Sequence, residues 1–129
     1  MNLVLRTGDD ALESIQAFAD RHHLDGASFY ALGAFRQSTI AYWNWETKTY
    51  EHIEVADQVE VLSMLGNVAT SSDGRRLHAH VVLGRRGGST IGGHLIRGTV
   101  RPTLEIFFAD AGTKLTRRKD PETGLWLLD

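Results

Sequence analysis

The chain has 129 residues, of which 42% are apolar, and this length suits one domain with one sizeable core. The charge is close to balanced, with 14 Lys and Arg against 16 Asp and Glu and a net charge of -2. That balance is a poor electrostatic footprint for a protein that binds DNA by itself, because duplex affinity comes largely from neutralised phosphates. There is no cysteine, which excludes disulfides and thiolate metal sites.

The N-terminal stretch "MNLVLRTGDDALES" reaches acidic residues within its first ten positions. It contains no apolar h-region, so we expect no signal peptide. No apolar run approaches the roughly 18 to 20 residues that a membrane span needs. We therefore expect a soluble, cytoplasmic protein with no membrane partner.

Residues 2–6 predict a short opening strand. Residues 8–24 predict an amphipathic helix, because apolar side chains recur there at intervals of three or four positions. Its apolar positions are Leu12, Ile15, Phe18 and Ala19. Asp9 or Asp10 is placed to cap the helix N-terminus, where a carboxylate also favours the helix dipole.

From Ala27 onward, aromatic and β-branched residues alternate with turn residues, which is typical of strands. The expected strands cover residues 27–35, 38–45, 49–55, 58–70, 77–84, 90–100 and 103–110. One main helix and about seven short strands predict an α+β fold, a single domain over 1–129 with a curved, mainly antiparallel sheet. The apolar residues 125–128 are expected to complete that sheet or to cover a neighbouring subunit.

Three of the six histidines lie in "LHAHVVLGRRGGSTIGGHL", residues 77–95. Residues i and i+2 of a strand face the same way, so His78 and His80 share one face, with Cα atoms about 6–7 Å apart. The intervening residues form a plausible hairpin connection that returns His94 to the adjacent strand. Gly92 and Gly93 precede His94, and paired glycines in a strand indicate a bulge or a close approach of backbones.

Three neutral imidazoles suit Zn, and also Fe, Ni, Co or Cu(II). Such a site leaves a fourth position for water, which is typical of catalytic zinc. Glu105 is a candidate fourth ligand, a candidate partner for an imidazole N–H, or a candidate general base. The alternative is that the histidines and Glu105 are ordinary exposed strand residues. Cupins also use His-x-His, but their motif needs a Glu soon afterwards, and residues 81–84 contain none.

The longer string "LSMLGNVATSSDGRRLHAHVVLGRRGGSTIGGHLIRGTVRPTLEIFF" resembles the PPC domain, the "plants and prokaryotes conserved" family. The segment "RTGDDALESIQAFADRHHLDGASFYALGAFRQSTIAYWN" is similar to the opening of that family, so the resemblance covers about residues 3–110. It implies an α+β fold that assembles as a homotrimer. It also implies a metal site, usually zinc, whose three histidines map onto His78, His80 and His94.

The family's usual label is DNA-binding, but in its plant members a separate AT-hook enters the minor groove, and this sequence has none. The basic clusters at 75–76, 85–86 and 117–119 are candidate phosphate contacts, although solvated loops are the simpler interpretation. We therefore expect direct DNA binding to be weak. Of the two properties that the resemblance implies, we expect the metal site to apply to this chain more readily than DNA binding.

Two hypotheses follow for the function. In the first, the protein is a trimeric binding or regulatory module in which a divalent metal, most plausibly zinc, supports a pocket for a small-molecule or protein partner. In the second, it is a metal-dependent, hydrolase-like enzyme acting on a small molecule, with Glu105 or Asn67 positioning substrate or water. The sequence offers no clear general base, nucleophile or phosphate loop, which favours the module.

Overall fold

The computed structural model describes residues 1–129, which form one helix and eight strands. In chain order the elements are β1 (Asn2–Arg6), α1 (Ala11–Arg21), β2 (Gly26–Asn44), β3 (Thr49–Val55), β4 (Val59–Ser71), β5 (Gly74–Gly84), β6 (Thr90–Asp110), β7 (Arg117–Lys119) and β8 (Trp126–Leu128). The expected α+β fold with one helix and a mainly antiparallel sheet is confirmed. Helix α1, at 11 residues, is too short to cross a bilayer.

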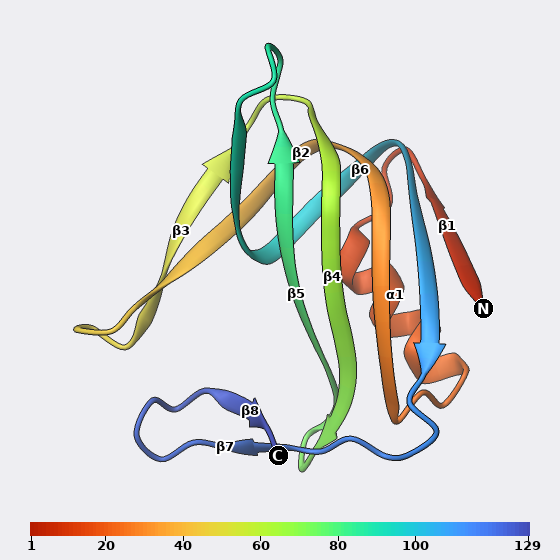
Figure 1. Ribbon diagram of the computed structural model, residues 1–129, viewed down its shortest axis with the longest axis vertical. Helices are drawn as coiled ribbons and strands as arrows, with labels where there is room; N and C mark the ends of the chain where they lie inside the picture. The colour runs from red at the N-terminus through yellow and green to blue at the C-terminus, as the bar shows by residue number, and fades with distance from the viewer.

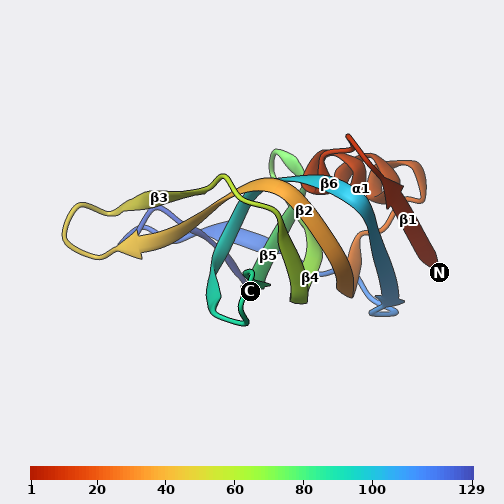
Figure 2. The same cartoon turned by 90° about the horizontal axis from the view of Figure 1, so that it is seen from above.

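The main sheet has six strands in the order β1-β6-β5-β4-β2-β3, and β6 also pairs with β2. Because of this additional pairing, hydrogen-bonded neighbours run from β2 through β4, β5 and β6 and back to β2. The sheet is therefore bent into an open, barrel-like form, with α1 packed behind β2 and β6 (Figures 1 and 2). The hairpin of β2 and β3 extends away from this body.

Two expected strand pairs are each a single continuous strand. The segments 27–35 and 38–45 both belong to β2, and the segments 90–100 and 103–110 both belong to β6. The pairing of β2 with β6 changes register three times, between Gly33 and Phe35, between Phe35 and Gln37, and between Thr39 and Ile40. These bulges let one long strand bend around the sheet. The polar and glycine residues that suggested a break between two strands instead mark the places where one strand bends.

The core lies between α1 and the concave side of the bent sheet. Asp10 caps α1 by accepting a hydrogen bond at 3.0 Å from the Glu13 amide, as the sequence predicted. The helix buries one apolar stripe, formed by Ala11, Ile15, Phe18 and Ala19. The largest fully buried strand side chains include Phe35, Ile40, Met64, Leu83, Leu95, Leu104 and Ile106. This packing fixes which side of β5 and β6 faces inward, and the other side carries the polar residues described below.

The tail does not join the main sheet. Residues 117–119 and 126–128 form a separate two-stranded sheet, β7 with β8. Hydrogen bonds from the Thr70 amide and hydroxyl to the Leu115 carbonyl oxygen, at 2.8 and 3.0 Å, attach the approach to this hairpin to β4. The sequence did not anticipate this separate layer, because three-residue strands carry too little periodicity to be recognised.

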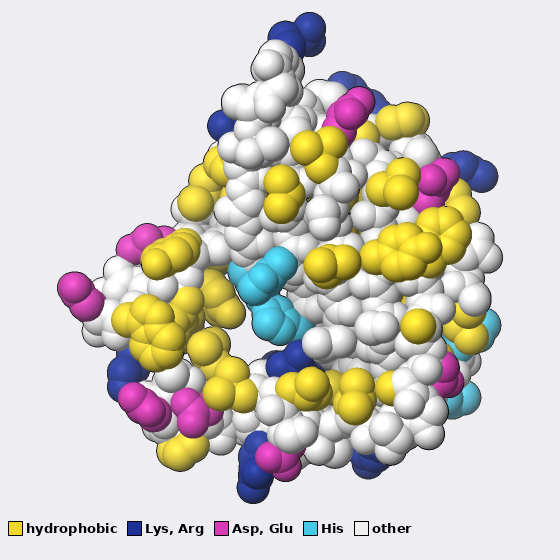
Figure 3. Space-filling model, in the orientation of Figure 1, with side chains coloured by type: hydrophobic (Ala, Val, Ile, Leu, Met, Phe, Trp, Pro, Cys, Tyr) yellow, Lys and Arg dark blue, Asp and Glu magenta, His cyan; other side chains and the backbone are white.

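Large apolar side chains gather on the convex side of the main sheet. We call this set the outer apolar face; it consists of Tyr30, Leu32, Leu62, Leu65, Val82 and Phe107. Tyr30 pairs with Leu65 on one side and with Phe107 on the other, and the Tyr30 and Phe107 rings stack at 5.2 Å between centroids. Figure 3 shows apolar side chains spread over this side of the molecule, next to the histidines.

Candidate metal centre

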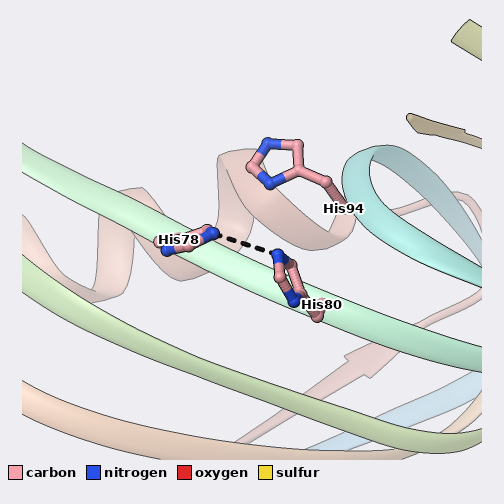
Figure 4. A group of neighbouring side chains, drawn as sticks. All are labelled: His78, His80 and His94. Atoms are coloured by element: carbon pink, nitrogen blue, oxygen red, sulfur yellow. Dashed lines mark hydrogen bonds between the residues drawn. The ribbon is translucent and has the colours of Figure 1, made fainter. Parts of the chain in front are cut away.

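The topology brings three histidines together. His78 and His80 lie two residues apart on β5, and both side chains leave the sheet on the side opposite the buried Ala79 and Val81. His94 lies on β6, where it is the direct register partner of His80. Figure 4 shows the three rings clustered, with His94 facing the pair on β5.

Two glycines allow this close pairing. A Cβ added to Gly92 would lie 2.8 Å from the Val81 carbonyl oxygen on β5, and one added to Gly93 would lie 2.8 Å from the Ala41 carbonyl oxygen on β2. Both contacts are too short for a real side chain, so β6 can lie against both neighbours only because these positions have none. The predicted close backbone approach is therefore present, and it holds His94 opposite His80.

The ring nitrogens are close enough to share one ion. One potential ligand atom from each histidine lies within 4.8 Å of the other two. The Nε2 atoms of His78 and His80 are 3.1 Å apart, at hydrogen-bond distance. A tetrahedral ion with metal–nitrogen bonds of about 2.0–2.1 Å would hold two nitrogens about 3.3 Å apart. Small ring rotations would therefore be enough to bring one nitrogen of each histidine to bonding distance from a shared ion.

His94 carries a buried polar atom with no partner. Its Nδ1 is buried and makes no hydrogen bond. In Figure 4 this nitrogen lies on the side of the ring that faces His78 and His80. The Tyr50 ring stacks on the imidazole at 4.6 Å between centroids, which fixes the orientation of the ring. Because an unpartnered buried nitrogen is costly, a bound cation is a good explanation for it.

Burial keeps two of the three imidazoles, those of His78 and His94, in the neutral form. Burial, followed by the nearby imidazoles of His78 and His80, lowers the pKa of His94 to about 4. Burial is also the main cause that lowers the pKa of His78, with smaller effects from His80 and the guanidinium of Arg117. A neutral imidazole is the form that binds a metal ion, so these two residues are ready donors at neutral pH.

Asn67 and Glu105 have different positions relative to this cluster. Asn67 on β4 is the register partner of His78, and its Oδ1 accepts a 2.6 Å hydrogen bond from Nη2 of Arg117. Glu105 lies eleven residues along β6 from His94, where its register partners are Val4 on β1 and Leu32 on β2. The group of residues that could share one ion contains the three histidines and no carboxylate. Glu105 is therefore not brought to the cluster within this chain.

The histidines open onto a cleft of about 880 Å³. The cleft is lined by His78, His94 and Tyr50, by one side of α1, and by residues of the C-terminal segment. Figure 3 shows the histidines at the edge of a hollow, with basic side chains beside them. A metal ion held here would face a space large enough for a small molecule, since ligand pockets are commonly about 300–1,000 Å³.

Sequence reasoning missed three cleft residues: Tyr50, Arg117 and Trp126. Tyr50 lies on β3, which reaches His94 only because β2 pairs with both β3 and β6. Arg117 and Trp126 lie on the short β7–β8 hairpin, whose place beside β4 no local pattern indicates. Arg117 was noted only as part of a basic cluster, yet it is almost fully buried. The only available signal was the apolar run at residues 125–128, which follows the basic residues at 117–119.

The sequence and the fold both have relatives. The model of the Plants and Prokaryotes Conserved (PCC) domain family matches residues 1–111. A plant- and prokaryote-conserved protein of Pyrococcus horikoshii has 30% identity and a TM-score of 0.92, with 100% of this chain and 90% of that chain covered. No curated protein matches the chain.

Two further solved structures are informative. A metal-containing protein of Archaeoglobus fulgidus has 32% identity and a TM-score of 0.89, with 99% of this chain and 91% of that chain covered. A protein of Ralstonia eutropha JMP134, whose name proposes that it binds DNA, has 28% identity and a TM-score of 0.92, with 99% and 89% covered. The likeness thus extends over the whole chain, including the hairpin beyond residue 111.

Proposed function

The chain belongs to the Plants and Prokaryotes Conserved (PCC) domain family, and from that premise we propose that it is a homotrimeric zinc-binding module. The zinc would be held by His78, His80 and His94. The single observation that carries the proposal is the convergence of one nitrogen from each histidine within 4.8 Å. The metal-containing relative from Archaeoglobus fulgidus, at 32% identity, supports it.

Zinc is the metal we assign because three imidazole nitrogens and one open position match its common four-coordinate geometry. When bound, the ion would polarise an oxygen of a molecule in the cleft or lower the pKa of a bound water. The protein's own contribution is orientation. The Tyr50 ring holds His94 by stacking, and the paired glycines hold β6 against β5.

The outer apolar face supports the trimer. Its Tyr30 and Leu65 are 54% and 62% exposed, although both lie in the middle of long strands. A small protein rarely leaves a contiguous apolar surface of this kind in water unless a partner covers it. A closed homo-oligomer buries the same patch on every subunit, and self-association is therefore the simplest partner.

We expect direct DNA binding by this chain to be weak. Arg75 contacts Asp20 and Asp25 at 3.3 and 2.9 Å, and Arg85 contacts Asp57 at 3.2 Å. Each of these cations is thus already paired with a carboxylate on its own surface. A module that takes part in DNA-associated regulation would then do so through a small-molecule or protein partner.

A hydrolase-like enzyme is the second candidate, and one feature favours it. An ion held by the three histidines would have a fourth position free for water, and the cleft beside His78 and His94 could admit a substrate next to it. In this scheme Asn67, beside His78, would position the substrate. A screen of esters, phosphoesters and lactones with and without chelator separates the two: chelator-sensitive turnover supports the enzyme, and none supports the module.

The proposal is tested by metal analysis of untagged protein. We expect near-stoichiometric zinc in the wild type and less than about a tenth of that in the His78→Ala/His80→Ala variant. A suitable control is His23→Asn, which removes an exposed histidine after α1 and substitutes a residue that tolerates its φ of 52°. Wild-type protein purified without chelator that contains no metal would contradict the proposal.

A further inference from the structure

Arg117 is a buried cation without a counter-ion. Its side chain is on β7, and the residue is only 8% exposed. Nη1 donates to the Trp126 carbonyl oxygen at 2.9 Å, Nη2 donates to Asn67 Oδ1 at 2.6 Å, and Nε is buried with no partner. No carboxylate lies within 4.0 Å of this guanidinium, whereas Arg75, Arg76, Arg85 and Arg118 all have one. An uncompensated buried charge is unfavourable unless something else neutralises it.

A second arginine lies in the wall of the same cleft. The Arg76 guanidinium lies over the Trp126 ring, with Cζ 4.1 Å from the ring centroid. Its carboxylate partner, Asp73, is 3.1 Å away and itself largely exposed, so the pair is open to solvent. Burial, and secondarily the charge of Arg76, lowers the pKa of Arg117, so the two guanidinium groups are close enough to repel each other.

The other residues that line the cleft indicate which kind of molecule would bind there. Leu77, Leu125 and Trp126 provide an apolar wall beside the two arginines. The carboxylates of the cleft belong to Glu13, Asp20 and Asp73, of which Asp20 is paired with Arg75 and Asp73 with Arg76. A volume of about 880 Å³ admits a small molecule with an apolar body. A DNA duplex does not fit, because it cannot reach a guanidinium that is 8% exposed at the side of a cleft.

We propose that this cleft binds a small organic oxyanion, with its carboxylate or phosphate group between Arg117 and Arg76 and its apolar part against Trp126. Arginine suits this role because its planar donors match both kinds of oxyanion. The two arginines share the cleft with His78 and His94, but the proposed contacts to the anion come from Arg117, Arg76 and Trp126 and include no metal ion. Arg117 and Trp126 lie beyond residues 1–111, the segment that the family model matches, whereas Arg76 lies within it.

Calorimetric titration tests the proposal with three related probes. Phenylacetate carries a carboxylate, phenyl phosphate carries a phosphate, and benzyl alcohol is the neutral counterpart. We expect saturable binding of at least one anion, with one site per chain and at least tenfold weaker binding of benzyl alcohol. We expect the same affinity, within about threefold, in protein treated with EDTA. Binding that disappears with EDTA would overturn the proposal, because the anion would then be a ligand of the metal.

Variants of the two arginines identify the site. We expect Arg117→Gln and Arg76→Gln each to weaken anion binding at least tenfold. Arg117 also joins β7 to β4, so thermal unfolding is needed to check that the Arg117→Gln variant is folded. Arg76→Gln changes a residue at the cleft surface, and its effect on binding can be measured whether or not Arg117→Gln folds. The matched control is Arg118→Gln, which removes the same charge from the next position on β7, where Arg118 is exposed and paired with Asp129.

Three further results would overturn the proposal. The first is that neither anion binds saturably, with or without metal. The second is that benzyl alcohol binds as tightly as the anions, since the arginines would then contribute nothing. The third is that Arg76→Gln and a folded Arg117→Gln both bind like the wild type. Failure of the metal analysis described above leaves this experiment unaffected, so the two proposals are tested separately.

Discussion

His80 and His94 face each other directly across the ladder of β5 and β6, while the His78 ring reaches the same space from two residues along β5. The pairing depends on Gly92 and Gly93, whose missing side chains let β6 lie against β5 and β2. The geometry of the proposed metal centre is thus set by backbone packing as much as by the histidines themselves.

Gly93→Ala should therefore disturb both the fold and the centre. The added methyl would lie 2.8 Å from the Ala41 carbonyl oxygen, and backbone cannot move aside as a flexible side chain can. Overpacking of this kind costs about 1–3 kcal/mol. We expect a lower free energy of unfolding in denaturant melts and at least tenfold weaker zinc affinity. Gly112→Asn is the control, because nothing lies within 4 Å of that position and its φ of +71° suits Asn.

The metal-free protein should lose stability as the pH falls from about 6.5 to about 4. Burial lowers the pKa of folded His94 to about 4 from an ordinary 6.5, so the unfolded chain takes up a proton first. Stability is thus fully present above pH 6.5 and falls through this window, by an amount on the order of 2 kcal/mol for this group. Denaturant melts of EDTA-treated protein at half-unit pH steps measure it.

His94→Gln should reduce that pH dependence, because it removes one of the two imidazoles, His78 and His94, whose pKa burial lowers. The lowered pKa values of Asp57 and Asp120 affect stability only below about pH 5, since their ordinary value is 3.8, and both carboxyls are present in the variant and in the wild type. They therefore do not confuse the comparison. An equal loss of stability between pH 6.5 and 4 in the variant and the wild type would show that His94 is not responsible.

Phe107→Asp should break the proposed trimer. The Phe107 ring stacks on Tyr30 in the outer apolar face, and a carboxylate there would be buried without a partner in any assembly that covers the face. Sedimentation velocity should give about three times the 14.3 kDa chain mass for the wild type and a monomer for the variant. Tyr42→Asp, on the exposed part of β2 near the hairpin, should leave the assembly intact.

DNA affinity should be weak and dependent on salt. A net charge of -2 and the pairing of Arg75 and Arg85 with carboxylates leave few cations to displace counter-ions from phosphates. Titration of a duplex at 50 and 150 mM salt should give a dissociation constant above about 1 μM at the higher concentration. Nanomolar affinity at physiological salt would contradict this prediction and would favour DNA binding, the property named for the relative from Ralstonia eutropha.

The histidine arrangement was predictable because strand periodicity is local. A spacing of two residues places His78 and His80 on one face, and a hairpin returns His94 beside them. The helix and its Asp10 cap were predictable for the same reason. The sequence could not show that β2 and β6 are continuous, because a bulge and a chain break have the same signature of glycine and polar residues.

The faces of β4 show how a bulge defeats a local prediction. Simple alternation would place Leu62 and Met64 on the same side, but the register shift between Val61 and Ser63 leaves Leu62 exposed and Met64 buried. The place of Leu62 on the outer apolar face could not be predicted from the sequence for this reason. The burial of Arg117 was missed for a different reason. It depends on the packing of the C-terminal segment beside β4, which is a contact between segments far apart in the sequence.

The most direct test of the central claim is an anomalous difference map from a crystal of the protein, collected on both sides of the zinc absorption edge. The account predicts one peak per chain, about 2.0–2.1 Å from one nitrogen each of His78, His80 and His94. Its anomalous signal should drop below the edge. A map with no peak among these rings, in crystals grown with zinc present, would contradict the account.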